Sequence, residues 1–266
     1  MSESRPQRFK ILIEFDGTDF VGWQIQPNGR SVQGEIEAAL HKLFGVEPRV
    51  HGAGRTDAGV HATGMTAHFD LDKQIDAYTL RRALNAELKA DITIREADIV
   101  DGDFHARFSA SSRSYVYSVA HERISLDRRQ QWILFARLDH DRLEEAVGRL
   151  AGTHDFKSFS KYVPDQTHHY CHVFEITWQR GDDVSRLHIR ANRFLQGMVR
   201  CIVGGLVQVG RGKLSPDDLS NILAARDRSR APMLAPPHGL VLTAVGYDQG
   251  DRTTISRIID ELQLGT

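Results

Sequence analysis

The chain has 266 residues, of which 41% are hydrophobic and 26% are charged, and its formal net charge is −1. This length suits one large domain or two smaller ones with a substantial core. No run approaches the roughly 18 apolar residues that a membrane span needs, and a net charge near zero argues against a uniformly basic surface that binds any nucleic acid. Two cysteines give no disulfide framework and the polar N-terminus lacks a signal peptide, so we expect a cytoplasmic protein without membrane contact.

Positive charge is nevertheless concentrated in two segments. Residues 105–137 hold six arginines against two acids, and residues 180–230 hold ten arginines and lysines against five aspartates. The rest of the chain is therefore near −10. On charge alone, solvated side chains on separate surfaces are the simpler interpretation, and a single basic face is the alternative.

The first half of the chain predicts the order strand, helix, strand, strand, helix, strand. Apolar residues alternate through 8–15, which is the period of a half-buried strand. Residues 31–45 have a helical stripe that Ser31 can cap and Gly45 can end. The remaining elements follow in the same way: the segment PRVHGAG at 48–54, a strand at 65–71, a helix at 77–88 and a strand at 92–100.

The second half repeats this order with longer excursions. The expected strands are 113–120, 172–180, 185–192 and 239–247, and the expected helices are 141–152, 193–210 and 215–226. Ser215 and Pro216 form a typical start signal for the last helix. We therefore predict an α+β fold in which two similar β-α-β-β-α-β halves, 1–103 and 104–266, form one catalytic unit. Their edges join into one extended, mainly antiparallel sheet, with helices on one face and an active-site cleft on the other.

The stretch GAGRTDAGVHA, residues 52–62, surrounds one carboxylate, Asp57, with glycines. Asp57 fits a local turn, because aspartate readily bonds nearby amides. A phosphate cradle is a second interpretation, although the lysine of a P-loop is missing. In a third, Asp57 is a catalytic carboxylate that Arg55 keeps ionised, and the glycines let a substrate approach the main chain. The residues alone leave these three interpretations open.

Five segments together resemble the tRNA pseudouridine synthase A family. They occur in the order that the family uses and cover nearly the whole chain. The segments are GWQIQPNGRSVQGEIEAAL (22–40), GAGRTDAGVHA (52–62), DFHARFSASSRSYVYSV (103–119), NRFLQGMVRCIVGGLVQVG (192–210) and GLVLTAVGY (239–247).

The resemblance implies an isomerase that detaches uracil from its ribose at N1, turns the base and reattaches it through C5. No atom is gained or lost, so we expect neither a metal nor a small-molecule cofactor. Asp57 would be the essential carboxylate, acting either as a nucleophile or as a proton acceptor. Arg55 would occupy the place of the flipped nucleotide or bind its phosphate, because a uridine within a helix must be extruded to reach the acid.

The resemblance also implies roles for residues of the second half. Tyr115 would stack under the uracil and take the C5 proton, and Arg200 would pair with the catalytic acid. Leu240 would line the base pocket. Tyr117 lies on the same face of the expected strand as Tyr115, so the sequence does not separate the two. The remaining substrate-binding candidates lie in the same resembling segments: Thr56, His61 and Arg107.

The expected partners are tRNA and a second copy of the chain. The resemblance implies uridines of the anticodon stem-loop, at tRNA positions 38, 39 and 40, as targets. It also implies a homodimer that holds one tRNA across both subunits. In such a dimer two modest basic faces would add, despite a net charge near zero.

Three alternatives stay open. The first is a noncatalytic RNA-binding or RNA-folding protein of the same fold, and the second is a synthase that acts on other RNA positions. The third is a metal-dependent hydrolase built on THHYCH, residues 167–172, because histidine and cysteine are zinc ligands. We prefer a polar approach to a strand for this segment, since a structural zinc site needs four convergent ligands.

Overall fold

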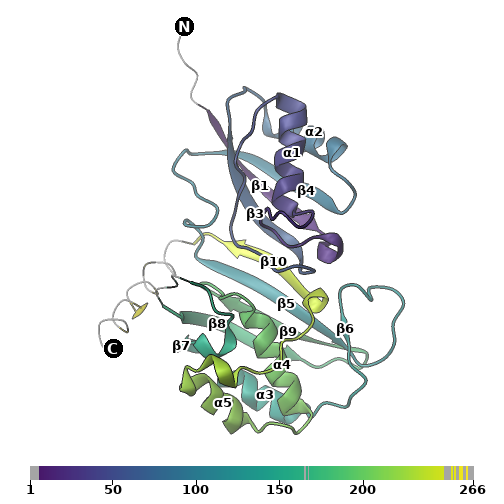
Figure 1. Cartoon of the computed structure of the whole chain (residues 1–266), viewed down its shortest axis with the longest axis vertical. Coiled ribbons are helices and arrows are strands. Elements are labelled where there is room, and N and C mark those ends of the chain that lie inside the picture. Colours follow the sequence, from purple (N-terminus) through teal and green to yellow (C-terminus); the bar gives the residue numbers. More distant parts are fainter. Residues whose placement is uncertain are drawn as a thin grey trace. The chain divides into compact units, whose positions relative to one another are not determined.

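The computed structural model describes residues 6–164, 166, 168–248, 253, 255, 258, 259 and 262 (Figure 1). The chain divides into two compact units. Unit 1 extends to Ala110 and includes Leu242–Tyr247, whereas unit 2 includes Ser111–Val241. Within each unit the described strands pair mostly in an antiparallel way and are combined with helices, so the predicted α+β class is confirmed.

The longer strands of unit 1 follow the order β4 (Ile92–Val100), β1 (Gln7–Phe15) and β3 (His61–Leu71). Both neighbours run antiparallel to β1, and Ile11 lies opposite Ala67 on one side and Ala97 on the other. Alternate side chains of β1 are buried, as the period of two predicted. The short strand β2 (His51–Gly52) pairs with β3 and leads into the GAGRTDAGVHA loop.

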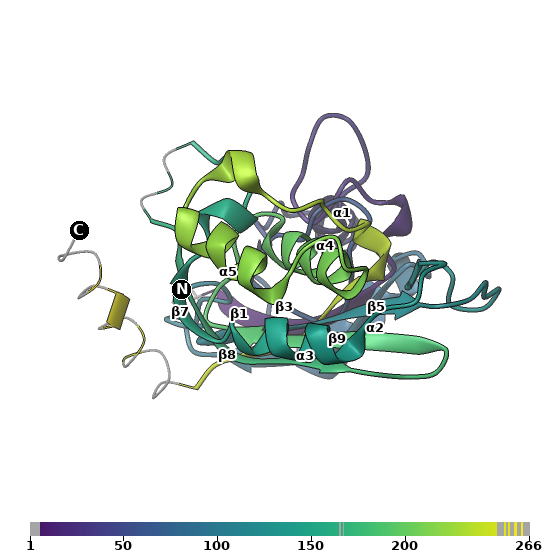
Figure 2. The ribbon, with the colours of Figure 1, turned by 90° about the horizontal axis from the view of Figure 1, so that it is seen from below.

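Two helices cover the strands of unit 1. Figures 1 and 2 show α1 (Val32–Phe44) on one side of these strands, and α2 (Ala77–Glu87) packs against both α1 and β4. Ser31 accepts a hydrogen bond from the Gly34 amide at 3.2 Å, and Gly45 ends α1 in the left-handed region with φ 68°. The order of elements in unit 1 is therefore the β-α-β-β-α-β order that the sequence predicted.

Residues 104–110, which we expected in the second half, belong to unit 1. The Phe104 carbonyl accepts a hydrogen bond from the Arg8 guanidinium at 3.0 Å, and the Ala106 amide donates to His68 Nδ1 at 3.1 Å. These bonds attach the connecting segment to β1 and β3.

The strands of unit 2 follow the order β5 (Ser112–Ala120), β9 (Val184–Ala191), β8 (Tyr170–Gln179) and β7 (Gly152–Asp155), all antiparallel to their neighbours. The short β6 (Trp132–Ile133) pairs in parallel with β5. The last strand, β10 (Leu240–Gly246), has its first two residues in unit 2 and the rest in unit 1. Neither β6 nor β7 was predicted, because two and four residues are too few to show a period.

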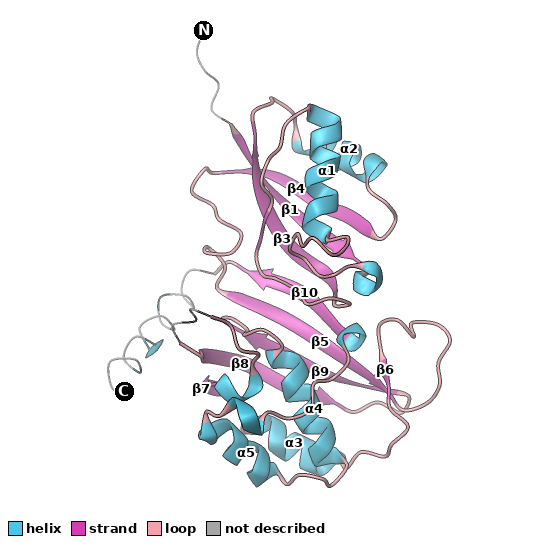
Figure 3. Cartoon of the chain, viewed as in Figure 1, coloured by secondary structure: helices cyan, strands magenta, loops and turns pink. Residues whose placement is uncertain are grey.

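Three helices of unit 2 pack against one another: α3 (His140–Gly148), α4 (Met198–Gly210) and α5 (Pro216–Ala225). Figure 2 shows α4 and α5 on the same side of the strands, and Figure 3 distinguishes helices from strands by colour. The capping signal of α5 is confirmed, because Ser215 Oγ accepts from the Asp218 amide at 3.0 Å and Asp218 accepts in return from the Ser215 amide at 2.8 Å.

The predicted start of α4 was wrong by five residues. Gly197 adopts φ 74°, which interrupts a helix that the apolar pattern placed from 193 onward. From Met198 on, α4 is largely buried. Among the described residues, no helix combines the length and apolarity that a membrane crossing would require.

Candidate active site

The candidate residues are divided between the two units. Unit 1 holds Arg55, Thr56, Asp57, His61 and Arg107. Unit 2 holds Tyr115, Arg200 and Leu240.

The GAGRTDAGVHA loop of unit 1 is fixed by main-chain contacts with the segment that precedes α1. The Trp23 amide donates to the Thr56 carbonyl at 3.2 Å, and Gly22 and Asp57 form an isolated antiparallel bridge. On the other side, the Val60 amide donates to the Asp57 carbonyl at 3.2 Å. The half-buried Asp57 side chain therefore extends from a main chain that is held in place on both sides.

Two glycines outside the loop make this close packing possible. Gly22 has φ 116°, and a Cβ there would lie 2.6 Å from the Thr56 carbonyl oxygen. A Cβ on Gly17 would lie 2.0 Å from the Val60 carbonyl oxygen. The sequence analysis gave these glycines no role in the site. Their positions were the only indication in the sequence: Gly17 follows the end of a strand, and Gly22 precedes Trp23.

Arg55 does not support Asp57 in the way that the residue chemistry suggested. Its side chain is exposed, and it forms neither an ion pair nor a hydrogen bond with any described residue. It therefore makes no contact with the Asp57 carboxylate in this structure. The guanidinium instead remains accessible to an anion such as phosphate.

His61 is buried, with only 2% of its surface exposed, and it fixes the neighbouring turn. Its Nδ1 accepts a hydrogen bond from the Gly17 amide at 3.0 Å and lies 3.1 Å from the Asp16 carboxylate. Its Nε2 and the Thr56 hydroxyl are buried and have no partner among the described residues. Burying a polar atom without a partner costs about 1–3 kcal/mol, so these two atoms do not themselves stabilise the loop.

Arg107 lies in an exposed turn that packs on histidines. His105 Nδ1 accepts hydrogen bonds from the amides of Arg107 and Phe108 at 3.1 and 3.2 Å. The His105 ring lies 4.5 Å from the ring of His68. Burial, together with His105 and His51, lowers the pKa of His68 to about 4, and burial also lowers the pKa of His105. Both rings are therefore neutral at physiological pH and can accept the bonds that hold the turn.

The structure distinguishes the two tyrosines that the sequence could not. Tyr117 is fully buried and its hydroxyl donates to the Pro236 carbonyl at 2.9 Å, and burial raises its pKa. Tyr115 is only half-buried, and its ring meets Phe194 edge to face at 5.1 Å. Tyr117 is thus a core residue, whereas Tyr115 retains accessible surface.

Arg200 and Leu240 are positioned by the segment 231–239. Arg200 Nε donates to the Ala235 carbonyl at 2.8 Å, and the Ala235 amide donates to the Arg200 carbonyl at 3.1 Å. Leu240 is buried at the start of β10, directly after Gly239, whose absent Cβ would lie 2.6 Å from the Tyr117 ring. Unit 2 therefore brings Arg200 and Leu240 to one segment that also contacts the strand of Tyr115.

The THHYCH segment is occupied by internal contacts, and its Thr167 lies outside the described residues. His172 Nδ1 lies 2.7 Å from the Thr153 hydroxyl, and His168 Nε2 lies 3.1 Å from the Arg193 guanidinium. Burial raises the pKa of the Cys171 thiol to about 12, which disfavours the thiolate that binds zinc. Across the described residues, no cluster of three histidine, cysteine, aspartate or glutamate side chains is arranged to hold a metal ion.

Comparison with known proteins gives a family match. A family model described as tRNA pseudouridine synthase matches residues 11–109 and 146–248. A protein of Paramagnetospirillum magneticum is 44% identical over 245 residues, which cover 90% of this chain and 95% of the relative. A protein of Rhodopseudomonas palustris is 45% identical over 249 residues, with 91% and 99% covered. Both are named tRNA pseudouridine synthase A.

A more distant relative of the same name, from Bacteroides thetaiotaomicron, is 41% identical over 246 residues and covers 91% of both chains. A chain from a solved structure titled a Cbf5-Nop10-Gar1 complex covers 90% of this chain and 59% of its own, at 12% identity and a TM-score of 0.33. A TM-score this low does not establish a shared fold. The sequence matches, however, confirm the resemblance of the motifs, and the chain belongs to the tRNA pseudouridine synthase family.

Proposed function

We propose that this protein is an isomerase that converts uridine to pseudouridine in the anticodon stem-loop of tRNA, at positions 38, 39 and 40. The observation that carries the proposal is the family match together with an intact GAGRTDAGVHA loop, whose acid extends from a main chain held on both sides. A fixed main chain suits this reaction because the carboxylate must meet the ribose or the base in one geometry. The reaction rearranges bonds within one nucleotide and consumes no cofactor.

Asp57 is the essential group in this proposal. Its carboxylate either bonds to the substrate as a nucleophile or accepts a proton from the sugar, so that the bond between C1′ and N1 breaks. The exposed Arg55 binds the phosphate of the flipped nucleotide or fills the space that it leaves in the stem. The unpartnered Thr56 hydroxyl supports a substrate contact, whereas the buried His61 supports the loop itself.

Unit 2 contributes the residues that hold the base. Tyr115 stacks on the uracil and receives the C5 proton, and its accessible surface favours it over Tyr117. Arg200 pairs with the Asp57 carboxylate and Leu240 lines the base pocket. Arg107 contributes a cation for the RNA backbone. In this proposal the two halves of the sequence, 1–103 and 104–266, act as one catalytic unit.

The protein acts as a homodimer in the cytoplasm. Both cysteines, Cys171 and Cys201, are buried and free, which supports a reducing compartment. Two copies holding one tRNA would combine the basic segments of both chains into one electrostatic footprint. Size determination with and without tRNA tests the dimer.

The decisive test incubates unmodified tRNA transcripts with wild type, Asp57→Asn and Asp72→Asn in the presence of a chelator, and maps pseudouridine at every position. Asp72 is an exposed carboxylate on the same unit and serves as the matched control. We expect product from wild type and Asp72→Asn, and a loss of at least about 1000-fold for Asp57→Asn, the size typical of losing a residue that takes part in the chemistry.

The positions at which pseudouridine forms, and the effect of the chelator, separate the alternatives. Product at other positions would replace the proposed target. Tight tRNA binding without product from the wild type would favour the noncatalytic RNA-binding protein. Activity that the chelator abolishes would favour metal-dependent chemistry, which the contacts of the THHYCH residues do not support.

A further inference from the structure

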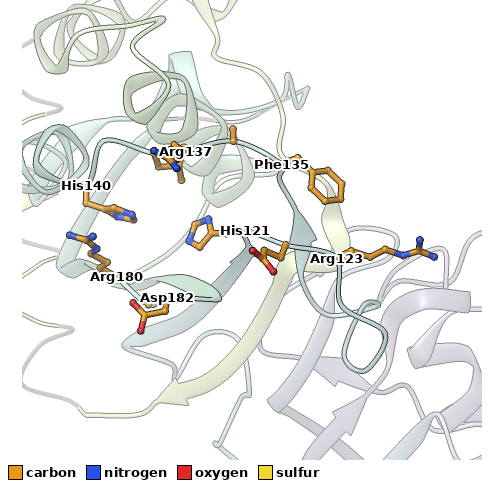
Figure 4. Close-up of a pocket in the computed structure, with 11 residues that line it drawn as sticks. His121, Arg123, Phe135, Arg137, His140, Arg180 and Asp182 are labelled. Atoms are coloured by element: carbon orange, nitrogen blue, oxygen red, sulfur yellow. The ribbon is translucent and has the colours of Figure 1, made fainter.

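Unit 2 contains a cavity of about 920 Å³ that none of the candidate catalytic residues lines. Three segments form its wall: the loop after β5, the stretch from β6 to α3, and the turn between β8 and β9. Its volume lies within the range of small-molecule and nucleotide sites. The lining residues are His121, Glu122, Arg123, Phe135, Ala136, Arg137, Leu138, His140, Arg180, Gly181 and Asp182 (Figure 4).

The arginines of this cavity lack carboxylate partners. Arg123, Arg137 and Arg180 form no ion pair with any described residue. Other arginines of unit 2 do form such pairs, as Arg149 does with Glu145 and Asp217. A guanidinium without a carboxylate offers planar donors that match a phosphate.

An aromatic side chain lines the same cavity as these cations. Phe135 is 77% exposed, although a large apolar ring is costly to leave in water. Figure 4 shows Phe135 and Arg123 at one end of the cavity and Arg180 at the other. Proteins use exposed aromatic rings to stack unpaired bases and nearby arginines to bind the phosphates, and this cavity is lined by both residue types.

Two histidines and two carboxylates complete the wall. Trp178 Nε1 donates to His140 Nδ1 at 3.1 Å, and His121 Nε2 lies 2.8 Å from the Ser185 hydroxyl. Burial lowers the pKa of both histidines, so the neutral His140 ring carries its hydrogen on Nε2 and can donate it. The carboxylates of Glu122 and Asp182 offer acceptors that suit the amino and imino groups of a base.

We infer that this cavity binds one unpaired nucleotide of the RNA substrate, other than the uridine that is isomerised. Phe135 stacks on the base, and Arg123 and Arg137 hold the adjoining phosphates. Most of the lining residues lie at 121–140, between the two ranges that the family model matches, so that match assigns them no role. The inference rests on the proposed function only in taking tRNA as the RNA.

The test compares four proteins on one unmodified full-length tRNA transcript: wild type, Arg123→Gln with Arg137→Gln, Phe135→Ala, and Arg149→Gln. Arg149→Gln is the matched control, because its guanidinium already pairs with two carboxylates. The measurements are the Kd of binding at several salt concentrations, the KM and kcat of pseudouridine formation, and the melting temperature as a check on folding.

We expect the Kd and KM of the double variant to be about tenfold higher than those of wild type. The slope of log Kd against log salt concentration should fall by roughly 1.4–1.8, because two phosphate contacts are lost. Phe135→Ala should weaken binding about fivefold or more while the salt dependence stays unchanged, because stacking is not ionic. The kcat of each variant should remain within about twofold of wild type, since an interaction lost equally from bound substrate and transition state leaves kcat unchanged.

Wild-type Kd and salt dependence in both folded cavity variants would overturn the inference. A fall in kcat without a change in Kd would overturn it as well. An inactive wild type whose tRNA binding still requires Phe135 and the two arginines would contradict the proposed function and support the cavity.

Discussion

The acid loop of unit 1 and the tyrosine face of unit 2 are held in place by different means. In unit 1, main chain meets main chain: Gly22 bridges Asp57, and the Trp23 amide bonds the Thr56 carbonyl. In unit 2, side chains bind a distant main chain, as the Tyr117 hydroxyl does at the Pro236 carbonyl and Arg200 does at the Ala235 carbonyl.

The two regions therefore tolerate different substitutions. Contacts between main chains need the absence of a side chain, so glycines control the acid loop. Contacts from side chains need one particular polar atom, so conservative changes such as tyrosine to phenylalanine remove them. Substitutions at these positions therefore test the comparison directly.

The largest effect is expected from Gly22→Ala. The new Cβ would lie 2.6 Å from the Thr56 carbonyl oxygen, and φ 116° is unfavourable for alanine. We expect a loss of about 2–4 kcal/mol in the free energy of unfolding, from strain combined with displacement of the loop. Urea unfolding measures this change, and pseudouridine formation should fall strongly because the loop carries Asp57.

Gly54→Ala is the matched control within the same loop. A Cβ at Gly54 meets no atom within 4 Å, and its φ is not positive. Its stability should therefore equal that of wild type or rise slightly, because alanine restricts the unfolded chain. Equal losses in the two variants would contradict the idea that close main-chain contact holds the acid loop.

Smaller effects are expected from substituting the two tyrosines, on stability for one and on kcat for the other. Tyr117→Phe leaves the Pro236 carbonyl without its donor and should cost about 1–2 kcal/mol of stability. Tyr115→Phe changes a side chain that is only half-buried, and kcat should fall because the proposed proton acceptor is lost.

Thermal melts and steady-state kinetics on both tyrosine variants separate the roles. The comparison holds if stability falls mainly in Tyr117→Phe and kcat falls mainly in Tyr115→Phe. A loss of kcat confined to Tyr117→Phe would reverse the assignment of the catalytic tyrosine.

Sequence patterns predicted those helices and strands that are long enough to show a hydrophobic period. The nine residues of β1 and the thirteen of α1 show clear periods of two and 3.6. The start of α4 was placed too early because Gly197 lies in an apolar run and only its left-handed φ of 74° reveals the break. Local patterns do not contain that information.

The sequence predicted the motif of the candidate site but not the contacts that hold it in place. The glycine-rich stretch identified Asp57 as the acid of interest, whereas Gly17 acts through a contact with Val60, distant in sequence. Tyr115 and Tyr117 are both tyrosines and lie two residues apart, so a strand places them on the same face. Their tertiary surroundings distinguish them: Tyr117 is buried and bonds to Pro236, which lies 119 residues away along the chain, whereas Tyr115 is only half-buried.

The smallest effect concerns pH and the turn that carries Arg107. Folding lowers the pKa of His68 to about 4 from an ordinary value of 6.5, through burial and through His105 and His51. The folded state therefore favours the neutral ring. Its contribution to stability is complete above pH 6.5 and is lost progressively as the pH falls toward 4, because the unfolded chain binds a proton that the folded chain does not.

We expect His68→Asn to reduce this dependence by up to one proton between pH 6.5 and 4. Its side-chain oxygen can still accept the Ala106 amide, which His68 Nδ1 accepts at 3.1 Å in the wild type. Urea unfolding at pH 7, 6, 5 and 4 measures the slope, and His41→Asn, at an exposed position of α1, should retain the slope of wild type. An unchanged slope in His68→Asn would show that the neutral His68 ring does not govern the stability of this part of unit 1. The acid loop, which is fixed by uncharged main-chain bonds, should keep its geometry across the same range of pH.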